Sequence, residues 1–285
     1  MNASDPQANQ HDPEPMTSVV WVRNLIDALT ACGLDGNGLA LRAGIKPETL
    51  EIIESGVWVK EIIRLWEFAV EASGNEAVGL LAAQTFLPSS VGVLGYAMMA
   101  SPNLFEALQR GVRYSGSVTT ATTASLTRID EGYRFSFHIM TGVVDVHRQN
   151  HEYVVSSFLH FFRWIAGRDL RPVRVEFMHP RPLELGAYQA FFDCPMAFGS
   201  AYTALVFSEA DLARQLLTSN PLLTGMLDHA AELRVMELGK AEMTQRVRQW
   251  IVKVLPQGEP TRDDIAARMN ISARTLQRRL QEEHQ

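Results

Sequence analysis

The sequence predicts an α+β fold, in which a mixed α/β N-terminal domain is followed by an all-α C-terminal module. Three observations carry this prediction: helix-type spacing of apolar residues in the first third, strand-type alternation near the middle, and two capped short helices at the end. The chain has 285 residues, of which 46% are hydrophobic and 20% charged. That composition is typical of globular proteins and supplies enough apolar surface for a sizeable core.

The first 18 residues predict a disordered tail, because they are rich in Asp, Pro, Gln and Asn. They contain neither a basic nor an apolar segment, so a signal peptide is not expected. No apolar stretch in the sequence approaches the roughly 20 residues that a membrane helix needs. The two cysteines, Cys32 and Cys194, fit a reducing compartment, and a cytoplasmic location is expected.

Helical spacing begins directly after this tail. Val22, Leu25, Ile26 and Leu29 fall on one helical stripe, and Gly33 is expected to end the element.

A second helix is expected over 61–72, where four apolar residues share one face. These residues are Ile62, Leu65, Trp66 and Ala69. Farther along, Ser101 and Pro102 predict the N-cap and the first position of a helix that runs through Leu108.

The period then changes from helix to strand. Apolar side chains at Tyr133, Phe135 and Phe137 alternate with polar ones, and residues 130–132 supply a turn before them. We therefore expect a hairpin over 124–139. A helix over 146–166 follows, then short strands over 174–178 and 204–207, and Ser208 with Asp211 predicts the cap of another helix.

This order of elements predicts a mixed domain over 19–218 and a linker helix over 219–241. Asn220 is expected to cap that helix, with Pro221 at its first position. The helix carries an apolar stripe at Leu223, Met226, Leu227, Ala230, Leu233 and Met236. The stripe indicates an interdomain linker, a dimer seam or a helix that packs on its own domain.

Residues 242–285 predict a helix-turn-helix. Thr261 with Asp264 forms the capping pattern of one short helix, and Ser272 can cap the next. Aliphatic residues on the two helices are spaced to lock them together; they are Ile265, Ala266, Met269, Leu276 and Leu280. Asn270 lies where the chain must turn sharply.

The outer face of the second helix is rich in Arg and Gln, which bind guanine and adenine edges in the major groove. Residues 242–285 hold eight Lys and Arg against six Asp and Glu, a net charge of +2, whereas the rest of the chain carries -8. Basic charge is thus concentrated where phosphates would lie. A helical hairpin with a solvated arginine face is the alternative interpretation.

The segment ISARTLQRRLQEE resembles the first helix-turn-helix of AraC-type (arabinose-regulator) transcription regulators. Segments 91–114 and 187–212 are similar to the effector domain of one large branch of that family. The resemblance implies a bacterial activator or repressor that binds promoter DNA, responds to a small-molecule effector of unknown identity, forms a homodimer and contacts RNA polymerase. It places Arg274, Gln277 and Arg278 toward bases, with Thr275 nearby. Ser272 and Arg279 become candidates for backbone contact.

The family carries two helix-turn-helix units, whereas this sequence contains only the first. From this difference we expect weak or no operator binding by these 285 residues. The alternative function is therefore an effector-binding and dimerisation module without competent DNA binding.

Six residues are predicted to line an effector pocket: Tyr96, Arg113, Tyr114, His138, His147 and His151. His147 and His151 also have a metal-ligand spacing, but the zinc-protease glutamate is missing between them. A metal-dependent enzyme that uses these two histidines is a third alternative. No group of catalytic residues in the sequence supports it. Neither a metal, nor a cofactor, nor enzymatic activity is expected.

Overall fold

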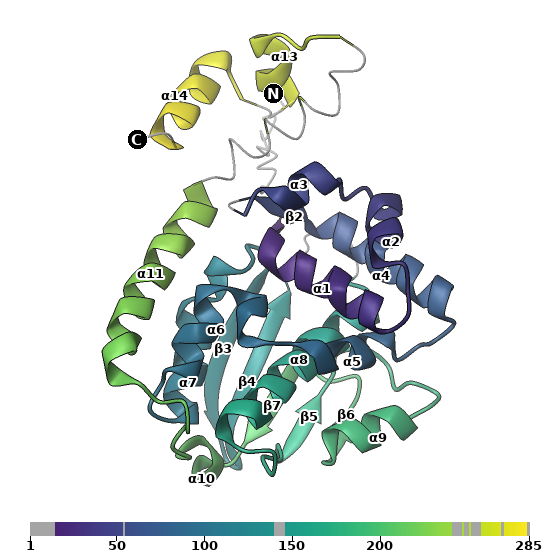
Figure 1. The fold of residues 1–285 in the computed structure, drawn as a ribbon, viewed down its shortest axis with the longest axis vertical. Coiled ribbons are helices and arrows are strands. Elements are labelled where there is room, and N and C mark those ends of the chain that lie inside the picture. The colour runs from purple at the N-terminus through teal and green to yellow at the C-terminus, as the bar shows by residue number, and fades with distance from the viewer. Residues whose placement is uncertain are drawn as a thin grey trace, which may run out of the picture.

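The apolar stripe that begins at residue 19 folds as expected. In the computed structural model, which describes residues 15–53, 55–139, 146–240, 247, 251, 258–268 and 271–283, α1 (Val19–Ala31) buries this stripe (Figure 1). Ser18 Oγ caps the helix by accepting from Trp21 N. α1 packs against α2 (Gly36–Ala43) and α3 (Pro47–Glu51), and α4 (Val59–Ser73) packs against α2.

α4 confirms the second predicted helix, since all four of its stripe residues are buried. Short helices continue the chain: α5 (Val78–Ala82), η1 (Ala83–Thr85), η2 (Pro88–Val91), α6 (Val93–Met99), α7 (Leu104–Arg113) and η3 (Ser115–Ser117). α7 begins later than predicted. Asn103 is its N-cap, with Oδ1 accepting from Glu106 N at 2.9 Å, while Ser101 Oγ donates back to Ala97 O in the preceding turn. The predicted capping role of Ser101 and Pro102 is therefore wrong.

The predicted hairpin is present as β3 (Thr122–Ile129) and β4 (Gly132–Ile139), paired antiparallel. It starts a five-stranded sheet of order β3-β4-β7-β5-β6, in which only β5 and β6 run parallel. The other strands are β5 (Arg174–Glu176), β6 (Met196–Ala197) and β7 (Thr203–Phe207). The sheet joins segments far apart in sequence, because β7 pairs with both β4 and β5.

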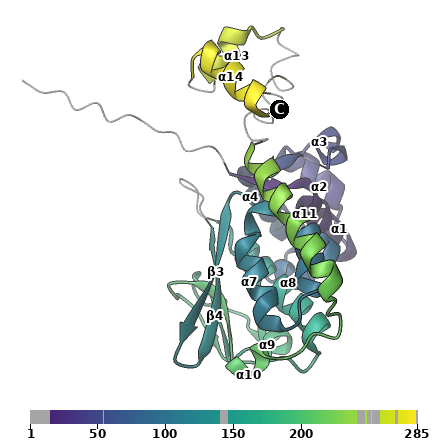
Figure 2. The same cartoon turned by 90° about the vertical axis from the view of Figure 1, so that its left-hand side faces the viewer.

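The helix predicted over 146–166 is α8 (Arg148–Ala166), whose apolar face is fully buried. Figure 2 shows that the sheet forms one layer, with α7 and α8 on one side of it. Phe162 on α8 packs edge-on against Phe135 and Phe207 of the sheet, with ring centroids 6.0 Å apart in both pairs. These contacts form the centre of the core.

α9 (Gly186–Phe192) and α10 (Glu209–Leu212) flank the sheet, and Ser208 caps α10 as predicted. α11 (Pro221–Lys240) then packs against α6 and η3. Asn220 Oδ1 accepts from Leu223 N at 3.2 Å, which confirms the predicted cap of α11. At the end of the described chain lie α13 (Arg262–Arg268) and α14 (Ala273–Glu283).

The predicted tail of residues 1–18 extends too far. β1 (Met16–Ser18) is buried and pairs antiparallel with β2 (Gly56–Trp58), so these three residues belong to the domain. A short strand that pairs with a partner forty residues away leaves no local periodicity to detect. Residues 1–14 lie outside the described residues.

Gly132 lies at the start of β4 with a φ of 133°, and a Cβ atom added there would clash with the carbonyl oxygen of Phe207. We expect Gly132→Ala to lower the free energy of unfolding by about 2 kcal/mol in urea titration, because both the backbone and β7 must move. Gly186→Ala is the matched control, since its Cβ meets open space in a helix. Equal stability of the two variants would contradict this account of the hairpin.

Candidate functional site

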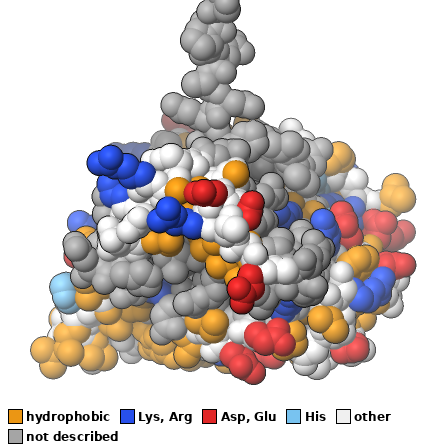
Figure 3. Space-filling view, turned by 90° about the horizontal axis from the view of Figure 1, so that it is seen from above, with side chains coloured by type: hydrophobic (Ala, Val, Ile, Leu, Met, Phe, Trp, Pro, Cys, Tyr) orange, Lys and Arg blue, Asp and Glu red, His pale blue; other side chains and the backbone are white. Residues whose placement is uncertain are grey.

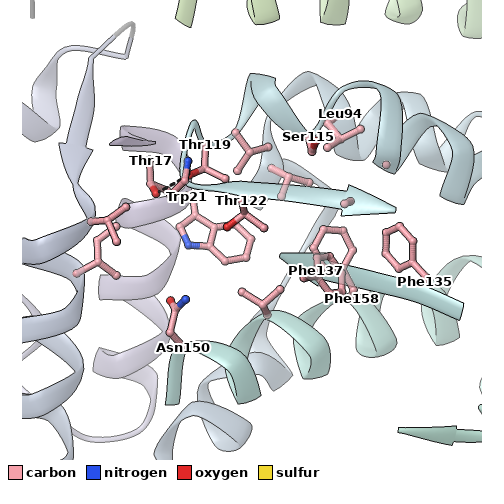
Figure 4. Close-up of a pocket in the computed structure, with 18 residues that line it drawn as sticks. Thr17, Trp21, Leu94, Ser115, Thr119, Thr122, Phe135, Phe137, Asn150 and Phe158 are labelled. Carbon is pink, nitrogen blue, oxygen red and sulfur yellow. Dashed lines mark hydrogen bonds between the residues drawn. The ribbon is translucent and has the colours of Figure 1, made fainter. Parts of the chain in front are cut away.

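A cavity lies between the N-terminal helices, α8 and the β3–β4 hairpin. Its empty space, including the part open to solvent, is about 700 Å³. Four aromatic side chains line it: Trp21, Phe135, Phe137 and Phe158. Five polar residues also line it: Thr17, Ser115, Thr119, Thr122 and Asn150 (Figure 4). Pockets of this size and composition commonly bind small molecules.

The periodicities of the surrounding elements explain which residues face this cavity. Asn150, Val154 and Phe158 are spaced four residues apart, so they share one face of α8. Phe135 and Phe137 share one face of β4 because strand side chains alternate. α7 and η3 complete the wall through Gly111 and Ser115.

The polar end of the cavity contains an ordered set of hydrogen bonds. Thr119 Oγ1 donates its single proton to Met16 O at 2.9 Å, so Thr17 must be the donor in the 3.0 Å contact between the two threonine hydroxyls. Asn150 Oδ1 accepts from Trp66 Nε1 at 3.3 Å. Because the indole N–H can only donate, the atom of the Asn150 amide that faces it must be the oxygen, and the amide nitrogen points the other way.

None of the six predicted pocket residues lines this cavity. Tyr96 and Arg113 are exposed, and Tyr114 is buried with its hydroxyl 3.5 Å from Glu232 Oε1. His138 lies on the opposite face of β4 from Phe137, edge-on to the ring of Tyr202.

The two α8 histidines also have other roles. His147 is the N-cap of α8, with Nδ1 accepting from Gln149 N at 3.2 Å. His151 is buried, with Nδ1 3.0 Å from Thr203 Oγ1, and burial lowers its pKa to about 4 with a smaller contribution from His179. In the described part of the chain, no group of three or more His, Cys, Asp or Glu is placed to hold a metal ion.

A buried polar cluster lies beside His151, on a face of α8 that does not line the cavity. Glu152 is fully buried; its Oε1 accepts from Tyr188 Oη at 2.6 Å and lies 3.1 Å from Arg148 Nε. Burial raises the pKa of Glu152 to about 7, although the Tyr188 hydrogen bond and the Arg148 charge oppose this effect.

The His179 ring also faces this carboxyl group. Its Nδ1 lies 2.8 Å from Pro180 O, so Nδ1 carries the proton and Nε2 of the neutral ring is an acceptor. Nε2 lies 3.4 Å from Glu152 Oε1. Two buried acceptors at this distance repel each other unless a proton is bound to one of them, and the raised pKa of Glu152 favours the carboxyl group as its holder.

The C-terminal helices form a second candidate site. Thr261 N donates to Asp264 Oδ2 at 2.9 Å while Asp264 N donates to Thr261 Oγ1 at 3.2 Å, which is the predicted capping box of α13. Ser272 Oγ accepts from Thr275 N at 3.2 Å and caps α14. Both caps show that the sequence determines the ends of these helices locally.

A small separate core holds α13 and α14 together. Val247, Ala266 and Leu276 are buried in it, and Ile265 and Leu280 pack against them. This confirms the predicted locking of the two helices through aliphatic side chains. Two further predicted positions, Met269 and Asn270, lie outside the described residues.

The predicted base-reading residues lie on the solvent side of α14. Arg274, Gln277 and Arg278 are exposed, whereas Thr275 is half-buried and its hydroxyl lies 2.9 Å from that of Ser272. Nothing is described for the side chain of Arg279. Seen from this end of the molecule, basic side chains lie among hydrophobic and acidic ones (Figure 3).

Known proteins share this architecture. Residues 33–216 match the family described as the arabinose-binding domain of AraC transcription regulators, N-terminal, which covers more than half of the chain. The chain belongs to the AraC family of transcription regulators. The resemblance predicted from the sequence is thereby confirmed, and a DNA-binding regulator fits this family.

Two individual relatives agree with that assignment. The ornithine utilization regulator of Pseudomonas aeruginosa is 25% identical over 269 residues, which span 93% of this chain and 78% of the relative. The crystal structure of the transcriptional regulator CdpR from the same species aligns with a TM-score of 0.50 at 21% identity, over 77% of this chain and 71% of that chain. The second likeness shows the fold alone.

The buried carboxyl group of this AraC-family domain leads to a pH prediction. Because the pKa of Glu152 is raised from its ordinary 4.5 to about 7, the folded state keeps a proton that the unfolded state loses, so this group lowers the free energy of unfolding as pH rises from 4.5 to 7. Glu152→Gln removes that loss. We expect its stability relative to the parent chain to grow from pH 5 to pH 7, on the order of 2 kcal/mol, and to level off above.

Urea titration at several pH values measures this difference. The lowered pKa of His151 gives an opposite slope between about pH 4 and 6.5, but it is common to both chains and cancels in the comparison. Glu184→Gln, at an exposed carboxylate, is the control. A stability difference that stays constant from pH 5 to pH 8 would show that Glu152 titrates normally.

Proposed function

We propose that this AraC-family chain binds promoter DNA through α14, senses a small molecule in the cavity of its N-terminal domain and acts as a homodimer. The observation that carries the proposal is the capped and locked helix pair, which leaves Arg274 and Gln277 exposed while Leu276 is buried. Contact with RNA polymerase and a cytoplasmic location are parts of the same proposal, which rest on the family resemblance.

The arrangement of α14 supports major-groove binding. Positions 274, 277 and 278 are three and four residues apart, so their side chains share one face of the helix. The buried Leu276 holds the opposite face on α13. An α-helix fits the major groove, where Arg pairs with guanine and Gln with adenine through two hydrogen bonds each.

The matched family of transcription regulators and the ornithine utilization regulator among the relatives support a regulator rather than an enzyme. Among the described helices, none is both long and apolar enough to cross a bilayer.

Arg274→Ala and Gln277→Ala test this proposal in a fluorescence-anisotropy titration with the promoter fragment at low salt, where the weak binding expected of a single helix-turn-helix is strongest. Each should weaken specific binding by about tenfold, because a bidentate contact to one base is worth about 1–3 kcal/mol. Arg128→Ala removes another exposed guanidinium, near the end of β3, and should leave affinity unchanged. Unchanged affinity in both α14 variants would refute the proposed recognition helix.

α11 supports the homodimer. The residues that face its own domain include Thr224, whose Oγ1 donates to Ala100 O at 3.0 Å, and the buried Ala231. The opposite face is also apolar: its residues Leu222, Leu223, Met226, Leu233 and Met236 are 44–80% exposed. α11 thus packs on its own domain, as one of the predicted alternatives states, but through another face: Leu223, Met226, Leu233 and Met236 of the predicted stripe are exposed.

The spacing of that exposed face indicates its partner. Leu222, Met226, His229, Leu233 and Met236 alternate steps of four and three residues, which is the seam of a coiled coil. Because one apolar face of α11 packs on its own domain, the other apolar face needs a partner outside the domain. In a dimer with two-fold symmetry, this face can pack against the same face of α11 in the second chain. We infer that α11 from two chains pack together.

A double variant, Met226→Glu with Leu233→Glu, should raise the dimer dissociation constant by about tenfold or more, because unpaired carboxylates would be buried in the seam. Sedimentation equilibrium measures this change, and circular dichroism checks the fold. Leu183→Glu, at a leucine 98% exposed away from α11, is the control. A dimer equally stable in the double variant would exclude this seam.

The name of the ornithine utilization regulator does not identify the effector of this chain. Ornithine carries two amino groups and a carboxylate, all charged at neutral pH. The 18 described residues that line the cavity include no charged side chain to pair with them. We therefore do not assign ornithine to this chain.

A further inference from the structure

We propose that the cavity binds an uncharged, mainly apolar molecule that presents one hydrogen-bond-accepting oxygen to Trp21 and Asn150. This inference rests on the proposed function, since it names the class of effector for the same domain. It follows from the charge, the free hydrogen-bonding groups and the shape of the cavity.

The charge argument excludes ionic ligands. All 18 described lining residues are apolar or neutral polar. A carboxylate or ammonium moved from water into such surroundings loses its hydration without gaining a counter-charge, which is more costly than any single hydrogen bond can offset. A neutral ligand meets no such cost.

The hydrogen-bonding argument defines the polar group of the ligand. The threonine hydroxyl protons at Thr17 and Thr119 are already donated within the protein. The Trp21 indole N–H and the Asn150 side-chain NH₂ meet no acceptor among the described residues. For Trp21 this is notable because the residue is buried, with only 6% of its surface exposed. In Figure 4 the nitrogen edge of the indole faces the side of the cavity on which Asn150 stands. Two donors on one side call for an acceptor, such as a carbonyl oxygen.

The walls define the apolar body. Phe137 and Phe158 stack with ring centroids 5.1 Å apart and planes inclined by 30°, and Phe135 meets Phe137 edge-on at 4.8 Å. Flat aromatic walls favour a flat apolar partner, because ring stacking adds to the burial of area. A ketone or ester on a one- or two-ring body fits this description.

Three probes of one shape test the charge argument by isothermal titration calorimetry at pH 7.5 on the 285-residue chain. They are the neutral ketone 2-acetonaphthone, the anion 2-naphthoate and the cation 2-naphthylmethylammonium. We expect the ketone to bind about tenfold or more tightly than either ion. Equal or tighter binding of an ion, or no binding of the ketone, would overturn the inference.

Location is tested by filling the cavity. Ala124→Leu places a larger side chain in the lining and should abolish ketone binding, whereas Thr123→Leu, on the exposed face of the same strand, should not. Binding unchanged in Ala124→Leu would place the ketone elsewhere and overturn the inference. Thermal unfolding of both variants checks that each is folded.

The donor is tested with Trp21→Phe. Both probes lose the same contact area with the indole ring, so this variant should weaken 2-acetonaphthone by about fivefold more than the oxygen-free 2-ethylnaphthalene, the value of one hydrogen bond. An equal loss for both probes would contradict the donor role. A separate promoter titration with and without ketone tests the proposed function, so that failed regulation and a wrong ligand class are distinguishable.

Discussion

The packing of α8 on the sheet is the constraint on which the rest of the domain depends. Phe158 and Phe162 lie against the rings of β4, and each fully buried aromatic side chain contributes about 2 kcal/mol. On the same helix, Phe158 and, about two turns nearer the N-terminus, Asn150 line the cavity. Core packing and ligand binding therefore share one rigid element, and a ligand that displaces α8 would disturb the core itself.

Helix α11 lies between that cavity and the C-terminal helices that we propose to read DNA. Gly111 and Ser115 line the cavity, and the residue before each of them, Arg110 and Tyr114, contacts α11. Arg110 binds Asp228 through two hydrogen bonds of 2.9 and 3.1 Å, largely out of solvent. A ligand that favours one position of α7 over another would thus bias the position of α11, which is the differential affinity that any effector-driven change requires.

The elements that the sequence predicted are those stabilised by near neighbours. Ser272 and Thr261 bond groups three residues away, and the stripe of α1 repeats within a few turns, so local pattern is sufficient. At three positions the predicted pocket residue stands next to one that lines the cavity: Ser115, Phe137 and Asn150 line it, next to Tyr114, His138 and His151. The histidines were predicted because they are polar. Which residue of a strand or helix faces the cavity depends instead on how that element is rotated about its axis. This rotation is set by packing against the neighbouring elements, which the sequence alone does not show.

The same reasoning explains why family membership fixes less about the ligand than about the fold. The fold depends on dozens of buried apolar contacts, which tolerate exchange among hydrophobic residues of similar volume. Ligand charge depends on whether a single lining side chain is ionised, since one buried unpaired charge outweighs several apolar contacts. A relative at 25% identity can thus keep every layer of this domain and still sense a molecule of another class. The neutral lining around Trp21 and Asn150, rather than the fold, is therefore the feature from which we infer the class of effector.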